Sequence, residues 1–175
     1  MVEGRRQLLK VIILGNANTG KTSLSSRLVR DKFSEDYWET IGADFTTFEL
    51  VHEGTNVTVQ LWDTAGQERY QSMGVAFYRG DGCIITYSIT SRASFDAIRR
   101  WFGEVESYMQ AGVILIVVGM KSDLEAQREV TFEEGKLLAE EFKALFIEAS
   151  AKAGSNLRQL TSTLVGSIIS NHASS

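Results

Sequence analysis

The chain has 175 residues, of which 43% are hydrophobic and 23% are charged, and its formal net charge at pH 7 is −4. This length and balance predict a single globular domain, and the mildly acidic charge argues against a general nucleic-acid-binding protein. With Cys83 as the only cysteine, no signal peptide and no apolar run of roughly 18 residues, we expect a cytoplasmic protein rather than a disulfide-bonded secreted or membrane-spanning one.

The first segment with a clear pattern is a short apolar run, residues 8–14, broken only by Lys10, which predicts a strand buried on both faces. Gly15 to Thr22 (GNANTGKT) then fit the phosphate-loop pattern G-x-x-x-x-G-K-[ST], and a helix is expected from Lys21 to about Arg30. Backbone N–H groups in such a loop, together with the positive end of the helix, bind an anion. We expect Lys21 to contact the terminal phosphates and the Thr22 hydroxyl to bind Mg²⁺; the alternative is a plain glycine turn.

The rest of the chain alternates between strand-like and helix-like segments. A hairpin is expected from strands 44–52 and 57–63, joined by a turn at 53–56, and a short helix should end near Tyr78. Later strands are expected at 83–87, 113–118 and 145–147, and later helices at 91–109, 131–142 and 156 to about 169. The helix at 91–109 should bury its aromatic face in the core, and Thr131 and Glu134 have the spacing of a capping box.

This order of elements predicts an α/β fold. The sheet should be mainly parallel, with one antiparallel edge strand and helices on both faces. Ligands bind such sheets beyond the carboxyl ends of the strands. Polar segments follow several of the expected strands, so they can converge at that edge.

One of these polar segments, residues 63–69, suits phosphate and magnesium chemistry. Asp63 ends an apolar strand, where a carboxylate can hold Mg²⁺ through water. Gly66 can contact a γ-phosphate through its backbone N–H, and Gln67 can orient an attacking water. Asp63 and Gln67 could instead be an ordinary strand-end residue and a solvated loop residue.

Two further segments suit a guanine base. Asp123 follows the strand at 113–118, and its carboxylate can accept two hydrogen bonds from the N1 and N2 edge of guanine, which adenine does not offer. The backbone of residues 148–152 (EASAK) can reach the guanine oxygen.

Taken together, these strings resemble a known family. With them the chain resembles a small GTPase of the Ras superfamily and, within it, a Rab; the strings are GNANTGKTS, TIGADF (residues 40–45), LWDTAGQER (61–69), FYRG (77–80), KSD and EASAK. The first half most resembles the late-endosomal and lysosomal Rab, and the part from Ser91 onward resembles secretory or general endomembrane Rabs. The resemblance implies a P-loop NTPase G domain with a six-stranded sheet over residues 8–170, after a polar lead-in (1–7) and before the start of a C-terminal tail (171–175).

The resemblance also implies roles for individual residues. Lys21 and Gln67 are the expected catalytic residues, and Thr22, Thr40 and Asp63 the expected Mg²⁺ ligands. Nucleotide contacts are expected from the phosphate loop, the first switch, the second switch and the two base loops: Gly15, Asn16, Ala17, Asn18, Thr19, Gly20, Lys21, Thr22, Ser23, Phe33, Thr40, Gly66, Lys121, Asp123, Ser150, Ala151 and Lys152. Effectors are expected to read Ile41, Phe45, Trp62 and Phe77, although Trp62 could equally be plain core.

The sequence departs from the family at several points. Met120 stands where the family carries an asparagine that tethers the phosphate loop and touches the purine, so weaker nucleotide binding and faster release are expected. Ala17 is expected to slow hydrolysis by crowding Gln67. Asn18 replaces a small residue, and the turn should survive because asparagine tolerates left-handed backbone angles. No cysteine follows Cys83, so the family's prenylated tail is expected to have been removed from a longer protein, unless this form is soluble.

The leading hypothesis is a Rab-like GTP/GDP switch in vesicle trafficking that binds Mg²⁺ and hydrolyses GTP slowly. By resemblance, its partners are an exchange factor, a GTPase-activating protein and effectors, with no nucleic acid, and the chain is expected to be a monomer. A prenylated full-length form would sit on the cytosolic face of endomembranes. One alternative is a weakly binding, hydrolysis-poor scaffold for effectors; another is a phosphotransferase or ATPase, against which Asp123 and EASAK argue.

Overall fold

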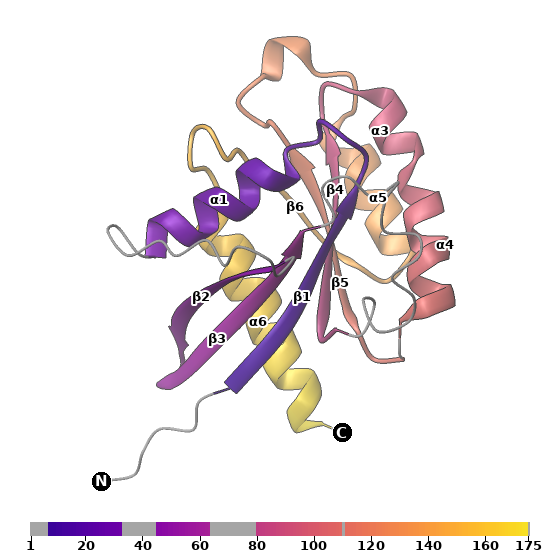
Figure 1. Ribbon diagram of the computed structural model, residues 1–175. Coiled ribbons are helices and arrows are strands. Elements are labelled where there is room, and N and C mark those ends of the chain that lie inside the picture. The colour runs from indigo at the N-terminus through magenta and orange to yellow at the C-terminus, as the bar shows by residue number, and fades with distance from the viewer. Residues whose placement is uncertain (1–6, 33–44, 64–79, 110, 175) are drawn as a thin grey trace, which may run out of the picture.

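A six-stranded sheet forms the centre of the computed structural model, which describes residues 7–32, 45–63, 80–109 and 111–174 (Figure 1). Its strand order is β2-β3-β1-β4-β5-β6. β2 pairs antiparallel with β3, and every other neighbouring pair is parallel, which confirms the expected sheet. The strands are β1 (Gln7–Gly15), β2 (Phe45–His52), β3 (Thr55–Asp63), β4 (Gly82–Ser88), β5 (Ile114–Met120) and β6 (Leu145–Glu148).

The hairpin of β2 and β3 closes more tightly than the expected four-residue turn. His52 pairs with Thr55, so only Glu53 and Gly54 lie between the strands. Both have positive φ, 48° and 78°. This is the backbone of a two-residue hairpin turn whose twist matches that of the strands.

Helices cover both faces of the sheet. Helices α1 and α6 contribute to the core on one face, and α3, α4 and α5 to the core on the other (Figure 1). The described helices are α1 (Lys21–Lys32), α3 (Arg92–Asp96), α4 (Ile98–Tyr108), α5 (Phe132–Glu141) and α6 (Leu157–Ala173), with a short 3-10 helix at Glu125–Gln127. The structure divides the expected helix at 91–109 into two at Ala97 and extends the last helix past residue 169. The short helix expected to end near Tyr78 lies outside the described residues.

The two cores follow from the alternation of side chains along β1. Val11 and Ile13 point into the core under α1 and α6, and Ile12 and Leu14 into the core under α4 and α5. All four are fully buried. A strand segment covered on both faces needs apolar residues at successive positions, which is why Val11 to Leu14 are all apolar.

The register of the parallel strands brings the chemically interesting segments to one edge. Asp63 at the end of β3 is level with Ile13, and Gly15 at the end of β1 is level with Thr86 in β4. On the other side, Ser88 is level with Met120. Residues far apart in the chain therefore meet beyond the carboxyl ends of the strands, where ligands bind in this class of fold. No helix among the described residues is long and apolar enough to cross a membrane.

Candidate functional site

The loop between β1 and α1 has the backbone of an anion-binding turn. Gly15, Asn18 and Gly20 have positive φ angles of 145°, 65° and 99°. A Cβ atom on Gly15 would lie 2.3 Å from Thr86 Oγ1, so glycine is required there. The left-handed angle at Asn18 confirms that asparagine accommodates the turn, because its short polar side chain tolerates this region.

Lys21 folds back onto the start of this loop. Its Nζ donates to the carbonyl oxygens of Gly15 at 2.7 Å and of Asn16 at 2.8 Å. The side chain is only 7% exposed, so its charge lies in a partly desolvated setting. A buried ammonium group needs hydrogen-bonding acceptors, and the loop carbonyls supply two of them. The geometry fits a cation that both closes the loop and attracts phosphate.

A buried hydroxyl network supports the loop from behind. Thr19 Oγ1 donates to the Asn16 carbonyl at 2.8 Å and lies 2.8 Å from Thr86 Oγ1. Thr86 in turn donates to the carbonyl of Leu14 at 3.2 Å. Thr19 and Thr86 are 1% and 0% exposed. Thr19 belongs to the phosphate-loop pattern and is expected at the site, whereas Thr86 is not, because a threonine inside an apolar strand gives no signal of such a role.

Met120, where the resemblance implies asparagine, lies at the end of β5 beside Gly20 of the phosphate loop. A Cβ atom on Gly20 would lie 3.6 Å from Met120 Cε, an ordinary van der Waals distance. The Met120 side chain is 1% exposed and belongs to the core shared with α1 and α6. The loop therefore has an apolar neighbour at this position, and a thioether cannot reproduce the hydrogen bonds of an amide.

The two base loops meet at the end of β5 and β6. Ser150 Oγ donates to Asp123 Oδ1 at 2.6 Å and accepts from the backbone N–H of Ala153 at 3.0 Å. The backbone N–H of Ser122 donates to the carbonyl of Ala149 at 3.2 Å. Ser150 is fully buried, whereas Asp123 is exposed. One Asp123 oxygen is thus fixed by the neighbouring loop and the carboxylate still faces outward.

An ion pair behind these loops was not predicted. Arg128 donates to both Glu148 carboxylate oxygens, at 2.7 and 2.8 Å, and to the carbonyl of Val130 at 2.8 Å. It also pairs with Glu125. The Arg128 and Glu148 side chains are 17% and 11% exposed. These hydrogen bonds raise the pKa of Arg128 and fix the residue that precedes Ala149 and Ser150.

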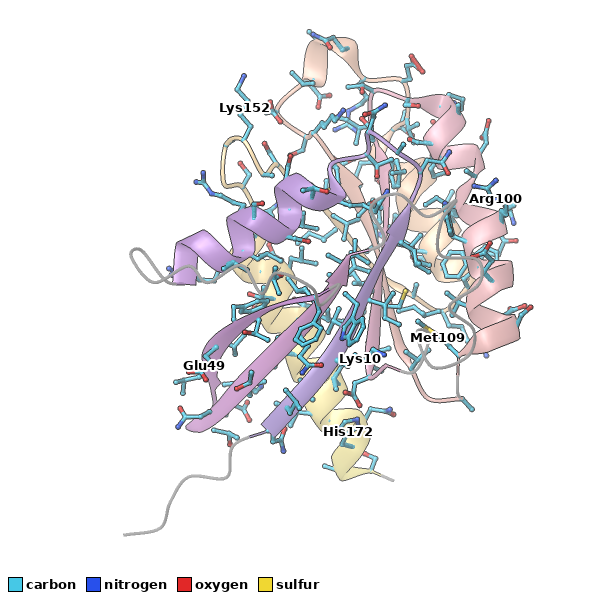
Figure 2. The ribbon with its side chains drawn as sticks, viewed as in Figure 1. Lys10, Glu49, Arg100, Met109, Lys152 and His172 are labelled. Carbon is cyan, nitrogen blue, oxygen red and sulfur yellow. The ribbon has the colours of Figure 1, made fainter. Side chains whose placement is uncertain are left out.

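Some of the remaining residues expected to contact the nucleotide or the effectors are described by the structure, and others are not. Ala17, Thr22, Ser23 and Lys152 are exposed near the loops, and Lys121 and Ala151 are half-buried. Lys152 lies at the same end of the molecule as the phosphate loop, and His172 lies at the opposite end (Figure 2). Six expected site residues lie outside the described residues: Phe33, Thr40, Ile41, Gly66, Gln67 and Phe77; for Asp63, only the backbone is described.

Two of the expected effector residues lie side by side on the hairpin. The rings of Phe45 and Trp62 stack with centroids 4.8 Å apart, and Lys10 Nζ lies 4.3 Å from the Trp62 ring centroid. Phe45 and Trp62 are half-buried. Trp62 therefore combines contact with the core and exposure at the surface, between the two alternatives that the sequence left open.

The described residues fit a magnesium nucleotide. Thr22 presents a hydroxyl in the first turn of α1, and the end of β3 brings Asp63 beside β1. Across the ranges that the structure describes, no group of three or more His, Cys, Asp or Glu side chains could hold a metal by itself.

Comparison with known proteins shows the family of the chain. The Ras family model matches residues 10–170. Ras-related protein RabC of Dictyostelium discoideum is 42% identical over 164 residues, which cover 92% of this chain and 84% of that protein. Ras-related protein RGP2 of Oryza sativa subsp. japonica is 40% identical over 159 residues, covering 90% and 73%. GTP-binding protein ypt2 of Schizosaccharomyces pombe is 40% identical over 162 residues, covering 92% and 81%. These relatives do not support the closer resemblance of the first half to the late-endosomal and lysosomal Rab.

Proposed function

The chain belongs to the Ras family of small GTPases, and from this premise we propose that it is a Rab-type switch that binds GTP and GDP and hydrolyses GTP slowly. The observation that carries the proposal is the joint geometry of Lys21 and Asp123. Lys21 is held at the phosphate loop by two carbonyls, and Asp123 is held by Ser150 at the same edge of the sheet. The two groups address opposite ends of one guanine nucleotide.

The residues at the phosphate end bind and orient. Lys21 supplies positive charge to the terminal phosphates, and the loop N–H groups between Gly15 and Thr22 supply donors. The hydroxyls of Thr22 and Thr40, together with the carboxylate of Asp63, would hold Mg²⁺, which would supply charge neutralisation of the phosphates. Gln67 orients the attacking water, and Ala17 slows this step by its methyl group.

At the base end, the residues select guanine. The outward-facing carboxylate of Asp123 accepts from two N–H donors on the base, and an adenine base lacks that edge. Lys121 and Phe33 cover the two faces of the base, and the backbone at Ser150, Ala151 and Lys152 approaches the guanine oxygen. This division of labour makes Asp123 the residue that determines specificity.

The switch itself depends on the segments around Thr40 and Gly66, which the γ-phosphate orders. Ordering them completes an effector surface with Ile41, Phe45, Trp62 and Phe77. An activating protein accelerates hydrolysis, and an exchange factor replaces GDP by GTP. The protein acts as a monomer in vesicle trafficking, on the cytosolic face of endomembranes where a lipidated tail attaches it.

One observation favours a second candidate, an effector scaffold with weak nucleotide binding and little turnover. Met120 places a buried apolar side chain beside Gly20 of the phosphate loop, where an amide would make hydrogen bonds. Multiple-turnover phosphate release in the presence of an activating protein separates the two. Sustained release supports the switch, and its absence supports the scaffold.

The test of guanine recognition uses Asp123→Asn. We expect the purified wild-type protein, once denatured, to release GDP or GTP on chromatography, and the variant to lose at least about 100-fold in guanine affinity, because two charge-assisted hydrogen bonds are lost. Asp96→Asn, which changes an exposed carboxylate on α3, is the matched control and should bind like the wild type. Adenine nucleotide in the wild type, or equal guanine affinity in Asp123→Asn, would contradict the proposal.

A further inference from the structure

Helix α4 makes hydrogen bonds to the phosphate loop that the sequence did not suggest. Trp101 Nε1 and Arg100 Nη2 both donate to the side-chain oxygen of Asn16, each at 3.2 Å. Both partners are donors only, so the amide oxygen of Asn16 must face the helix. The contact joins residues 84 and 85 positions apart in the chain.

Asn16 is also the residue whose backbone holds Lys21. Its carbonyl oxygen accepts from Lys21 Nζ and from Thr19 Oγ1, both at 2.8 Å. The same residue is therefore held by α4 through its side chain and holds the phosphate-binding cation through its backbone. A shift of the Asn16 side chain moves the Asn16 carbonyl oxygen, because only a few bonds separate the two groups.

The two donors have different surroundings. Trp101 is 5% exposed and lies in the core under α4, so its ring is fixed by packing. Arg100 is exposed and its guanidinium carbon lies 5.0 Å from the Trp101 ring centroid. Figure 2 shows Arg100 on this helix. The tryptophan provides a rigid anchor, and the arginine adds a second donor from the solvent side.

We propose that Arg100 and Trp101 are positioning residues for the phosphate loop, which hold Asn16 and through it the site of Lys21. The inference rests on the proposed function, since it concerns how tightly a nucleotide is retained. Loss of either donor loosens Asn16 and weakens the fixed geometry of the Lys21 ammonium group, and preorganised geometry is what lowers the cost of binding. Nucleotide release therefore becomes faster without any change in a residue that touches the nucleotide.

Helix α4 itself offers a matched control for the arginine. Arg99 is the preceding residue, is equally cationic, and pairs instead with Glu141 of α5 at 2.7 and 2.8 Å. Its side chain is 60% exposed. Arg99→Ala removes the same charge and leaves the contact with Asn16 in place.

The experiment measures dissociation of fluorescent GDP from the loaded protein after addition of excess unlabelled GDP. We expect Arg100→Ala to accelerate release by about 3- to 10-fold, the effect of one exposed to half-buried hydrogen bond, and Arg99→Ala to stay within about twofold of the wild type. Arg100→Gln keeps a donor but loses the charge, so it should restore most of the slow release. Asn16→Ala should also accelerate release, and adding Arg100→Ala to it should have no further effect.

The outcomes separate the failure of this inference from failure of the proposed function. A wild-type protein that retains no GDP overturns both. If the wild type retains GDP, the inference alone fails when Arg100→Ala releases it like Arg99→Ala, or when the effects of Asn16→Ala and Arg100→Ala multiply. If Arg100→Gln behaves like Arg100→Ala, the arginine acts through its charge on the phosphates rather than by positioning Asn16. Thermal melts identify any variant that does not fold. If Arg100→Ala does not fold, Trp101→Phe tests the same inference, because it removes the other hydrogen-bond donor to Asn16.

Discussion

The most informative perturbation is Met120→Asn, which exchanges apolar packing for an amide directly beneath the phosphate loop. Met120 is 1% exposed, and its Cε would lie 3.6 Å from a Cβ atom on Gly20, so its thioether and methyl group fill core space next to the loop. The substitution introduces the residue type that the resemblance implies for the family at this position. Its effects on folding and on nucleotide retention should have opposite signs.

The magnitudes follow from burial and hydrogen bonding. Burying a methionine side chain is worth about 1.5–3 kcal/mol, so the nucleotide-free variant should lose about 2 kcal/mol of folding free energy. Two or three new hydrogen bonds from the amide to the loop and the purine should contribute about 1–3 kcal/mol to nucleotide binding. Release of GDP should then be about 10- to 100-fold slower than from the wild type.

Dissociation of fluorescent GDP measures the effect on nucleotide retention, and thermal melting of the nucleotide-free protein measures the effect on folding. Met120→Leu is the control, because it keeps an apolar side chain of similar volume and adds no hydrogen bond. We expect its GDP release to stay within about threefold of the wild type. A folded Met120→Asn variant that releases GDP as fast as Met120→Leu would refute the reasoning.

Two further predictions concern ion pairs. Arg128→Met leaves Glu148 largely buried without its main partner and should lower the free energy of unfolding by about 2–4 kcal/mol in urea titrations. Arg99→Met removes an exposed ion pair and should change the free energy of unfolding by less than about 1 kcal/mol. Equal effects of the two substitutions would contradict the role of burial. The side-chain hydrogen bond from Arg92 and, to a smaller extent, the backbone hydrogen bond from Thr131 lower the pKa of Glu134 from 4.5 to about 2. The contribution of the Glu134 carboxylate to stability is therefore complete above about pH 4.5 and is lost as the pH falls toward 2. Glu134→Gln should therefore lose less stability than the wild type between pH 5 and pH 3, and parallel stability curves would exclude this contribution.

Local patterns predicted most of the fold. The apolar run at 8–14 became the doubly covered strand β1, and the spacing of Thr131 and Glu134 became a complete capping box at the start of α5. Such features depend on neighbours a few residues apart, which a sequence displays directly. The division of the helix at Ala97 is the kind of local detail that a periodic pattern does not resolve.

The sequence could not show how distant side chains meet. Trp101 has the spacing of a core residue, and it is buried, but one edge of its ring also donates to Asn16. Arg128 and Glu148 look like ordinary surface charges until β6 brings them together. Hydrophobic periodicity indicates which face of a helix is buried, but not which polar atom on that face finds a partner across the fold.

The assembly of the site from both ends of the chain has a thermodynamic consequence. Gly15 and Ser150 belong to loops that adjoin strands at opposite sides of the sheet centre, and only the folded sheet brings their strands into register. A nucleotide that needs both loops binds the folded state and not the unfolded one. At a ligand concentration 1,000 times its Kd, this coupling adds about 4 kcal/mol to the free energy of unfolding. That is a large share of the total free energy of unfolding of a typical domain. Each tenfold weakening of binding, as expected from Met120, removes about 1.4 kcal/mol of this stabilisation by the ligand. The nucleotide concentration therefore helps to determine the fraction of the protein that is folded.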